Sequence, residues 1–181
     1  MNVRLIAGKY GGRTIGAPRT SRTHPMSERI RNAMFNSLGS EVVGAVVLDA
    51  FAGSGAIGLE ALSRGASEAT FVERDRIAQK VLQENIDLLG APNAHLVRSS
   101  VAAWLDTTGA TQRYDIIFVD PPYHDPQFST VKRIFGLLKP NGLMVLSHTD
   151  TGEVPAQDDI VVVDNRSYGN ANLTLYRRDT P

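Results

Sequence analysis

The sequence predicts one α/β domain in which helices cover both faces of a mainly parallel β-sheet. Between residues 46 and 147, short apolar runs alternate with longer amphipathic segments, which is the order of strands separated by helices. Near the C-terminus, the runs 160–163 and 173–177 have no helix between them and predict an antiparallel pair at one sheet edge. We expect strands at 46–50, 69–73, 94–98, 114–120 and 143–147, and helices at 56–64, 76–89, around Trp104 and at 128–138.

A hairpin and a helix are expected ahead of this alternating part. Residues 3–9 and 13–15 flank a glycine turn and predict a β-hairpin. Ser27 is a good N-cap for a helix over 28–38, and Gly39 is a plausible stop. The helix buries one apolar face, and we place Arg31 away from it. The chain is therefore divided into a basic hairpin, 1–22, and a main domain, 23–181.

Composition narrows the class of protein. The chain has 181 residues, is 42% hydrophobic and contains no cysteine. Disulfides and thiolate metal sites are therefore excluded, and the four scattered histidines predict no metal site. No apolar run is long enough to cross a bilayer, and the N-terminus does not resemble a signal peptide. We expect a cytoplasmic protein, and nothing in the sequence demands more than a monomer.

Charge is distributed unevenly, although the net charge is zero. Residues 1–31 hold seven basic side chains and one acidic one, which leaves 12 basic and 18 acidic for the rest. A basic segment on an acidic body favours a polyanionic partner such as a nucleic acid. The alternative is a solvated arm whose arginines pair with carboxylates of the body. The RNA-binding candidates are Arg4, Lys9, Arg13, Arg19 and Arg22.

A glycine-rich turn follows the strand 46–50. Residues 53–58 match G-x-G-x-x-G, and Glu73 lies twenty residues after Gly53, at the end of the next strand. This spacing is typical of a nucleotide cradle in which the carboxylate accepts the ribose hydroxyls. The pattern fits both NAD and S-adenosylmethionine. Asp49 favours the second, because a carboxylate suits an ammonium and a sulfonium better than a pyrophosphate; alternatively, Asp49 orders its own loop.

The strand 114–120 ends in a second motif, formed by Asp120, Pro121, Pro122 and Tyr123. An exocyclic amine of a nucleobase is a poor nucleophile, and two hydrogen-bond acceptors can hold it in line with a methyl donor. Asp120 offers a carboxylate and Pro121 a carbonyl, Pro122 stiffens the turn, and Tyr123 can stack on an extracted base. The alternative is a rigid strand exit with a half-buried tyrosine.

The order of these motifs resembles the RsmD family of amino methyltransferases. The similar segments are 4–13, 23–31, 32–36, 51–55 and 59–66, and the likeness extends to about Gly142. The resemblance implies a Rossmann-like class I S-adenosylmethionine-dependent methyltransferase sheet of order 3-2-1-4-5-7-6 with a small N-terminal hairpin. It also implies S-adenosylmethionine as cofactor and methylation of the 2-amino group of guanine 966 in 16S rRNA, within an assembling or assembled small ribosomal subunit.

The resemblance further implies roles for particular residues. Residues 120–123 would hold the target guanine, and the hairpin would grip RNA. The cofactor would contact Thr23, Pro25 and Ser27 at its amino-acid end, Phe51, Ala52, Gly53, Ser54 and Gly55 along its methionine part, Glu73 and Arg74 at the ribose, and Ser100 and Val101 at the adenine.

Two positions depart from the family pattern. His24-Pro25-Met26 stands where members usually have Arg-Pro-Thr, so a contact from that arginine is not expected. Ser100 lies near a position where many members have an acidic residue. We therefore expect the backbone of Val101 to read the adenine.

Other functions remain open from the residues alone. A DNA adenine amino-methyltransferase fits residues 120–123, but such enzymes usually need a larger target-reading region than the basic N-terminus offers. An NAD-binding oxidoreductase fits the glycine turn and leaves residues 120–123 unexplained. A non-catalytic RNA-binding module explains the basic segment and leaves the glycine turn unexplained.

Overall fold

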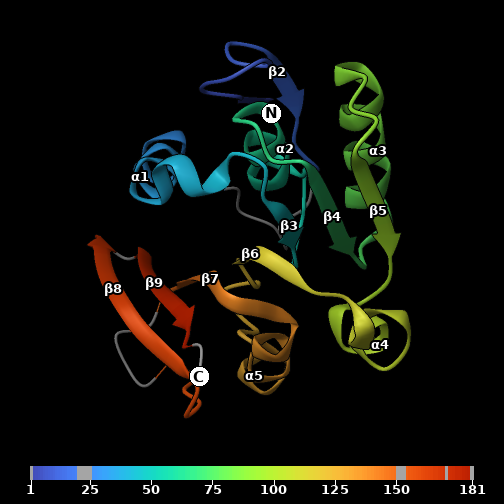
Figure 1. The fold of residues 1–181 in the computed structure, drawn as a ribbon. Coiled ribbons are helices and arrows are strands. Elements are labelled where there is room, and N and C mark those ends of the chain that lie inside the picture. The colour runs from blue at the N-terminus through green and yellow to red at the C-terminus, as the bar shows by residue number, and fades with distance from the viewer. Residues whose placement is uncertain (1, 20–25, 150–153, 170, 180–181) are drawn as a thin grey trace.

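The computed structural model describes residues 2–19, 26–149, 154–169 and 171–179 (Figure 1). Its centre is a seven-stranded sheet of order β5-β4-β3-β6-β7-β9-β8. The strands are β3 (Val46–Asp49), β4 (Glu68–Glu73), β5 (Ala94–Arg98), β6 (Tyr114–Val119), β7 (Leu138–His148), β8 (Ile160–Tyr168) and β9 (Ala171–Arg178). The first five are parallel, and β9 runs antiparallel to β7 and β8. Counted from β3, this is the expected order 3-2-1-4-5-7-6.

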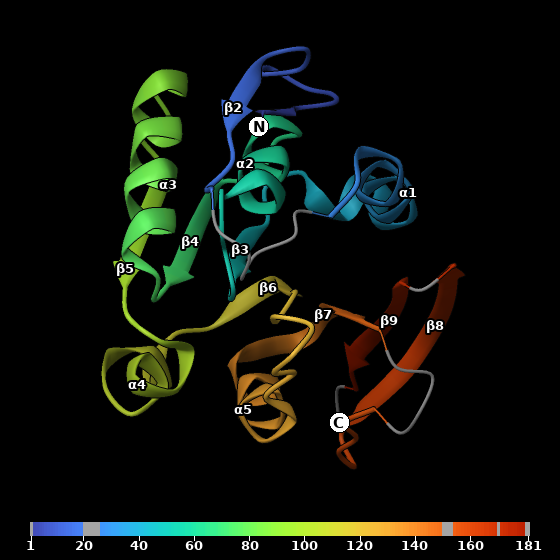
Figure 2. The same cartoon turned by 180° about the vertical axis from the view of Figure 1, so that it is seen from behind.

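Helices cover both faces of the sheet, as Figures 1 and 2 show from opposite sides. The α-helices are α1 (Glu28–Leu38), α2 (Ala56–Ser63), α3 (Arg76–Leu89), α4 (Val101–Leu105) and α5 (Phe128–Ile134). Short 3₁₀ turns follow at Gly39–Val42, Thr108–Thr111 and Phe135–Leu137. α1, α2 and α3 contribute to one apolar cluster, and α4 and α5 to the other.

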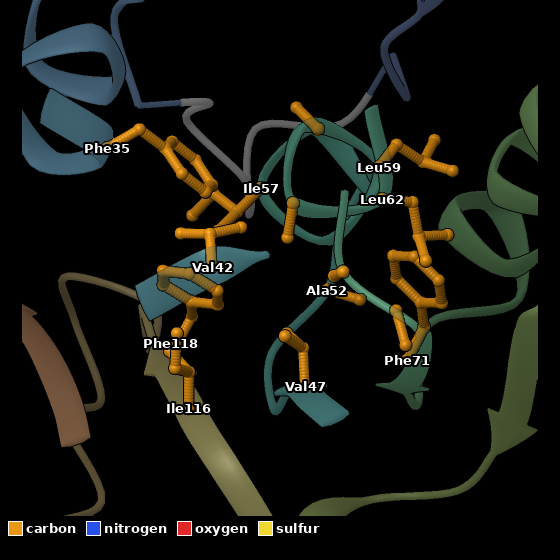
Figure 3. Close-up of a cluster of buried hydrophobic side chains, with 14 of the residues drawn as sticks. Phe35, Val42, Val47, Ala52, Ile57, Leu59, Leu62, Phe71, Ile116 and Phe118 are labelled. Atoms are coloured by element: carbon orange, nitrogen blue, oxygen red, sulfur yellow. The ribbon is translucent and has the colours of Figure 1, made fainter. Parts of the chain in front are cut away.

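Strand periodicity divides the core between these two clusters. In β6, Ile116 and Phe118 face the first cluster, whereas Ile117 and Val119 face the second. Figure 3 shows the first cluster, where Phe35 of α1 lies over Phe118 with ring centroids 5.4 Å apart. Because these strands are buried on both faces, they appear in the sequence as continuous apolar runs.

The C-terminal strands are longer than predicted. β7 begins at Leu138, which pairs with Tyr114, and its register shifts before Leu143 pairs with Ile116. The irregular stretch includes Asn141 with a φ of 63°, so no strand periodicity is visible there. β8 continues to Tyr168 although residues 164–167 are polar, because it is an edge strand whose side chains are largely exposed.

The N-terminal hairpin packs on the domain. β1 (Asn2–Arg4) and β2 (Thr14–Gly16) form a separate two-stranded antiparallel sheet. The loop between them docks on the end of α2, where Lys9 N donates to Ser63 O at 2.9 Å. Gly8 has a φ of 82°, and a Cβ there would lie 1.8 Å from Ser63 O, so this contact requires glycine.

Arg31 was predicted to lie away from the buried face of α1, and the structure shows that this prediction is wrong. Its side chain is 1% exposed, and its Nε lies 3.5 Å from Oε1 of Glu60, which is itself fully buried. Glu60 also accepts hydrogen bonds from Ile6 N at 2.9 Å, Ala7 N at 3.1 Å and Arg64 Nε at 2.9 Å. A buried carboxylate with this many donors ties the hairpin, α1 and α2 together, and helical periodicity alone did not reveal it.

Candidate active site

A cavity of about 750 Å³ opens at the carboxyl ends of β3, β4, β5 and β6. In open α/β sheets ligands bind at this edge. The lining residues are Phe51, Ala52, Gly53 and Ser54 from the glycine turn, Glu73 and Arg74 at the end of β4, Ser100 and Val101 at α4, and Asp120, Pro121, Pro122 and Tyr123 after β6. The structure therefore brings both sequence motifs to one cavity.

Glycine is needed at two positions of the turn for different structural reasons. Gly53 has a φ of 56° and lines the cavity, and a Cβ there would meet no described atom within 4 Å. Gly55 has a φ of 84° and faces inward, where a Cβ would lie 2.2 Å from Cδ1 of Leu82. Gly53 thus leaves room for a ligand, whereas Gly55 is needed for packing and is absent from the cavity lining.

Glu73 connects the glycine turn to the next strand. Its Oε1 accepts from Gly53 N and its Oε2 from Asp75 N, each at 2.8 Å. Each carboxylate oxygen can accept more than one hydrogen bond. Glu73 can therefore also accept hydrogen bonds from hydroxyl groups of a ligand in the cavity that it lines. Two backbone N–H groups thus fix the orientation of a carboxylate that lines the cavity.

Asp49 lies below the cavity. It is 1% exposed and is absent from the lining, and its Oδ2 accepts from Gly58 N at 2.9 Å. Burial raises the pKa of Asp49 to about 8, against the opposing effect of that hydrogen bond. Because this hydrogen bond joins Asp49 to the segment that follows its own strand, it agrees with the loop-ordering alternative.

Asp120 lies at the cavity wall and is held by a neighbouring strand. Burial raises its pKa to about 7, while a hydrogen bond with Ser147 lowers it. Tyr123 is 51% exposed at the mouth, and burial together with the charge of Asp120 raises its pKa. A half-exposed ring beside the partly buried carboxylate of Asp120 can stack on a flat ligand whose amine reaches that carboxylate.

Ser99 and Ser100, at the start of α4, are engaged in hydrogen bonds within the fold. Ser100 Oγ caps α4 by accepting from Ala103 N at 3.1 Å, and Ser99 Oγ donates to Ser100 O at 2.8 Å. Val101 is the first helical residue, a position whose N–H has no partner within the helix. Val101 can therefore donate to an adenine ring nitrogen.

The structure does not place every predicted cofactor or RNA contact at the cavity. Ser27 caps α1 by accepting from Ile30 N at 3.2 Å and does not line the cavity. Arg22, Thr23 and Pro25 lie outside the described residues.

The four described basic candidates lie on or beside the hairpin, away from the cavity lining. Arg4 pairs with Glu28, Arg13 donates to Leu88 O at 3.0 Å, and Lys9 Nζ lies 5.0 Å from the centroid of the Tyr10 ring. Arg19 is exposed. Some of the basic charge is thus already used within the fold, as the solvated-arm alternative expects.

The cavity also contains residues that sequence reasoning missed. These are Pro18, Met26, Arg31, Ala50, Ala56, Ile57, Val72, Asp75, Arg76, Ile77 and Gln127; Ser99 and His124 also line the cavity. Asp75 could have been found, since Asp directly before a helical pattern is an N-cap signal. Arg31 had no comparable signal, because its partner Glu60 is distant in sequence.

Metal sites and membrane spans are two further features that would define a class of protein. Across 2–19, 26–149, 154–169 and 171–179, no group of three or more His, Cys, Asp or Glu residues could hold a metal ion. Within the same residues, no helix has the length and apolar character to cross a membrane.

The sheet order, the glycine turn and the residues after β6 define a Rossmann-like methyltransferase fold. A family profile described as "Conserved hypothetical protein 95" matches residues 3–177. The chain belongs to this family, the RsmD family, whose methyl donor is S-adenosylmethionine.

Named relatives and solved structures agree. The chain is 39% identical to "Ribosomal RNA small subunit methyltransferase D" of Escherichia coli over 77% of this chain and 68% of that protein. It is 29% identical to "Putative rRNA methyltransferase YlbH" of Bacillus subtilis over 97% of this chain and 99% of that protein. The structure of "Putative methyltransferase yhhF" from Escherichia coli superposes with a TM-score of 0.90 at 32% identity, covering all of both chains.

Proposed function

We propose that this protein methylates the 2-amino group of a guanine in 16S rRNA, the base numbered 966, within an assembling or assembled small ribosomal subunit. The observation that carries the proposal is the position of Asp120 and Tyr123 in the wall of the cavity that also contains the glycine turn and Glu73. The names of the relatives support rRNA as the substrate class. In this proposal the enzyme works in the cytoplasm and as a monomer.

The cavity suits the cofactor. Open space at Gly53 admits the methionine chain, Glu73 accepts the ribose hydroxyls, and the N-terminus of α4 meets the adenine. S-adenosylmethionine supplies an electrophilic methyl group on a sulfonium. We assign Phe51 to Ser54 to the methionine part because they line the cavity at the turn.

The residues after β6 orient the guanine amine that receives the methyl group. A guanine amine is delocalised into its ring, so it needs two acceptors to hold it for in-line attack. Asp120 and the carbonyl of Pro121 supply these acceptors, and Tyr123 stacks on the base. With the amine held in line by these residues, its nitrogen would form the bond to the methyl carbon as the carbon–sulfur bond breaks, and water would then take the extra proton.

The hairpin and the start of α1 hold RNA in this proposal. Lys9 and Arg19 are exposed, and Arg29 lies on the exposed side of α1. Contacts between such basic side chains and RNA phosphates would position the RNA but carry no sequence information by themselves. Selection of the base must therefore come from the pocket.

Methyl transfer from labelled S-adenosylmethionine tests the proposal. Substrates are small-subunit particles lacking this methylation, free 16S rRNA and duplex DNA, with the labelled nucleoside identified by mass. The expected product is 2-methylguanosine in rRNA at one position. Label in DNA adenine, or none in rRNA from folded protein that binds the cofactor, would contradict the proposal.

A further inference from the structure

A second, smaller cavity adjoins the first. It has a volume of about 150 Å³ and shares the wall formed by Pro121, Pro122 and Tyr123. Pro126 and Phe128 form further apolar lining, and Ser147 lines it from the carboxyl end of β7. The cavity is far smaller than the first one, so it suits a single planar base and not a nucleoside cofactor.

Ser147 is buried where the two cavities meet. Val119 pairs with Leu146 on adjacent parallel strands, so the next residues, Asp120 just after β6 and Ser147 still within β7, are neighbours. Ser147 is 8% exposed and hydrogen-bonds to the Asp120 side chain. Asp120 lines the first cavity and Ser147 the second, so this hydrogen bond lies at their junction.

The hydrogen bond determines what Ser147 can offer a ligand. An ionised carboxylate has no hydrogen to donate, so with Asp120 charged the serine hydroxyl donates and the carboxylate accepts. A hydroxyl has one hydrogen and two lone pairs. With its hydrogen directed at Asp120, Ser147 Oγ presents an acceptor to the second cavity.

Two neighbouring acceptors match two neighbouring donors. On guanine the 2-amino group stands beside N1–H, which is also a donor. On adenine the 6-amino group stands beside N1, which is an acceptor and would face the lone pairs of Ser147. Adenine could be accommodated only if Ser147 gave up its hydrogen bond to Asp120.

We propose that the second cavity receives the target purine and that Ser147 accepts from N1–H, thereby selecting guanine over adenine. This inference rests on the proposed function and assigns base selection to a residue of β7, outside residues 120–123. Pro126 and Phe128 supply the apolar side of the site, and the amine points through the junction to Asp120.

The test uses a base that keeps the amine and changes N1. Small-subunit particles are reconstituted with rRNA carrying either guanine or 2-aminopurine at the target. 2-Aminopurine has the same 2-amino group but an unprotonated N1 and no O6, so the part of the preference that depends on Ser147 is the readout. Wild-type protein is expected to prefer guanine roughly 10- to 100-fold in kcat/KM, since the analogue leaves a polar group mismatched. In Ser147→Ala the preference is expected to fall below about threefold.

Controls separate base reading from folding. Ser147→Thr keeps a hydroxyl and should restore most of the preference. Ser37→Ala removes a hydroxyl that donates to Met34 O at 2.7 Å in α1, and should leave the preference unchanged. Thermal unfolding of each variant confirms that it is folded.

The outcomes distinguish the two proposals. If wild-type protein makes 2-methylguanosine but methylates both bases equally, or if Ser147→Ala keeps the full preference, then Ser147 does not read N1 and the inference is wrong while the proposed function stands. If folded wild-type protein methylates no guanine in rRNA, the proposed function fails first, and the inference fails with it.

Discussion

Asp49 and Asp120 end neighbouring strands of the same sheet, yet they have different environments. Asp49 is in register with Phe118, so Asp120 lies two residues, or about 7 Å, further along the strand direction. Asp49 therefore sits beneath the glycine turn and holds Gly58 N. Asp120 reaches the cavity wall and is held by Ser147. A small offset in register separates a carboxylate that orders a loop from one that can touch a substrate.

The two carboxylates also differ in what they can still accept. Burial raises both pKa values, to about 8 for Asp49 and to about 7 for Asp120. Asp49 has a backbone donor and no cavity surface, so its protonation affects stability. Asp120 faces a cavity, so its protonation affects the reaction.

Removing Asp120 should have the largest effect on activity. Asp120→Ala is expected to lower kcat for rRNA methylation by roughly 10²- to 10³-fold, because the amine loses a preorganised acceptor. Cofactor affinity, measured by calorimetry, should change less than about threefold, because Asp120 is expected to contact the guanine amine and not the cofactor. Normal turnover would remove Asp120 from the mechanism.

The pH dependence of the reaction should report Asp120. Asp120 accepts from the amine most strongly when its carboxyl group is ionised, and the pKa of Asp120 is about 7. Activity is expected to fall as pH decreases through about 7, approaching a tenfold loss per pH unit. Single-turnover rates between about pH 5.5 and 9 measure this limb. A rate that stays constant across this range would contradict a carboxylate acceptor.

Asp49→Asn should change stability more than activity. The pKa of Asp49 rises from 3.8 to about 8 on folding, so the unfolded chain loses this proton first as pH increases. Stability from this group is therefore lost between about pH 4 and pH 8. Asn keeps an acceptor for Gly58 N and cannot ionise, so the variant should be at least about 1 kcal/mol more stable at about pH 8.

Urea unfolding at about pH 5 and about pH 8 measures the effect of Asp49→Asn, with Asp87→Asn on the exposed side of α3 as a control. Cofactor affinity is the sharper readout. A large loss of affinity in Asp49→Asn would show that Asp49 contacts the ligand and that the contrast with Asp120 is wrong.

Charge reversal on the hairpin should have the smallest effect. Lys9→Glu with Arg19→Glu is expected to weaken RNA binding several-fold at low salt and to reduce the salt slope by about one for each phosphate that these side chains neutralise. Arg113→Glu, in an exposed turn before β6, is the control. An unchanged slope in the double variant would mean that these side chains do not contact phosphate.

Local patterns in the sequence determined much of this protein. Apolar runs predicted which segments along the chain form strands, capping residues predicted both ends of α1, and glycines marked the turn after β3. Residues 120–123 were visible because their chemistry is contiguous. Each of these signals is local, since backbone conformation and burial repeat over a few residues.

Only the tertiary structure decided which of those residues share a space. Arg31 and Glu60 are far apart in sequence, so their buried contact could not be read from either segment. The second half of the edge strand β8 carries polar residues at 164–167 because it is exposed to solvent, so the apolar run at 160–163 revealed only the first half. The register between β3 and β6 separates Asp49 from Asp120, and the register between β6 and β7 brings Ser147 to Asp120. Strand register depends on non-local pairing, and that pairing positions the side chains of the site.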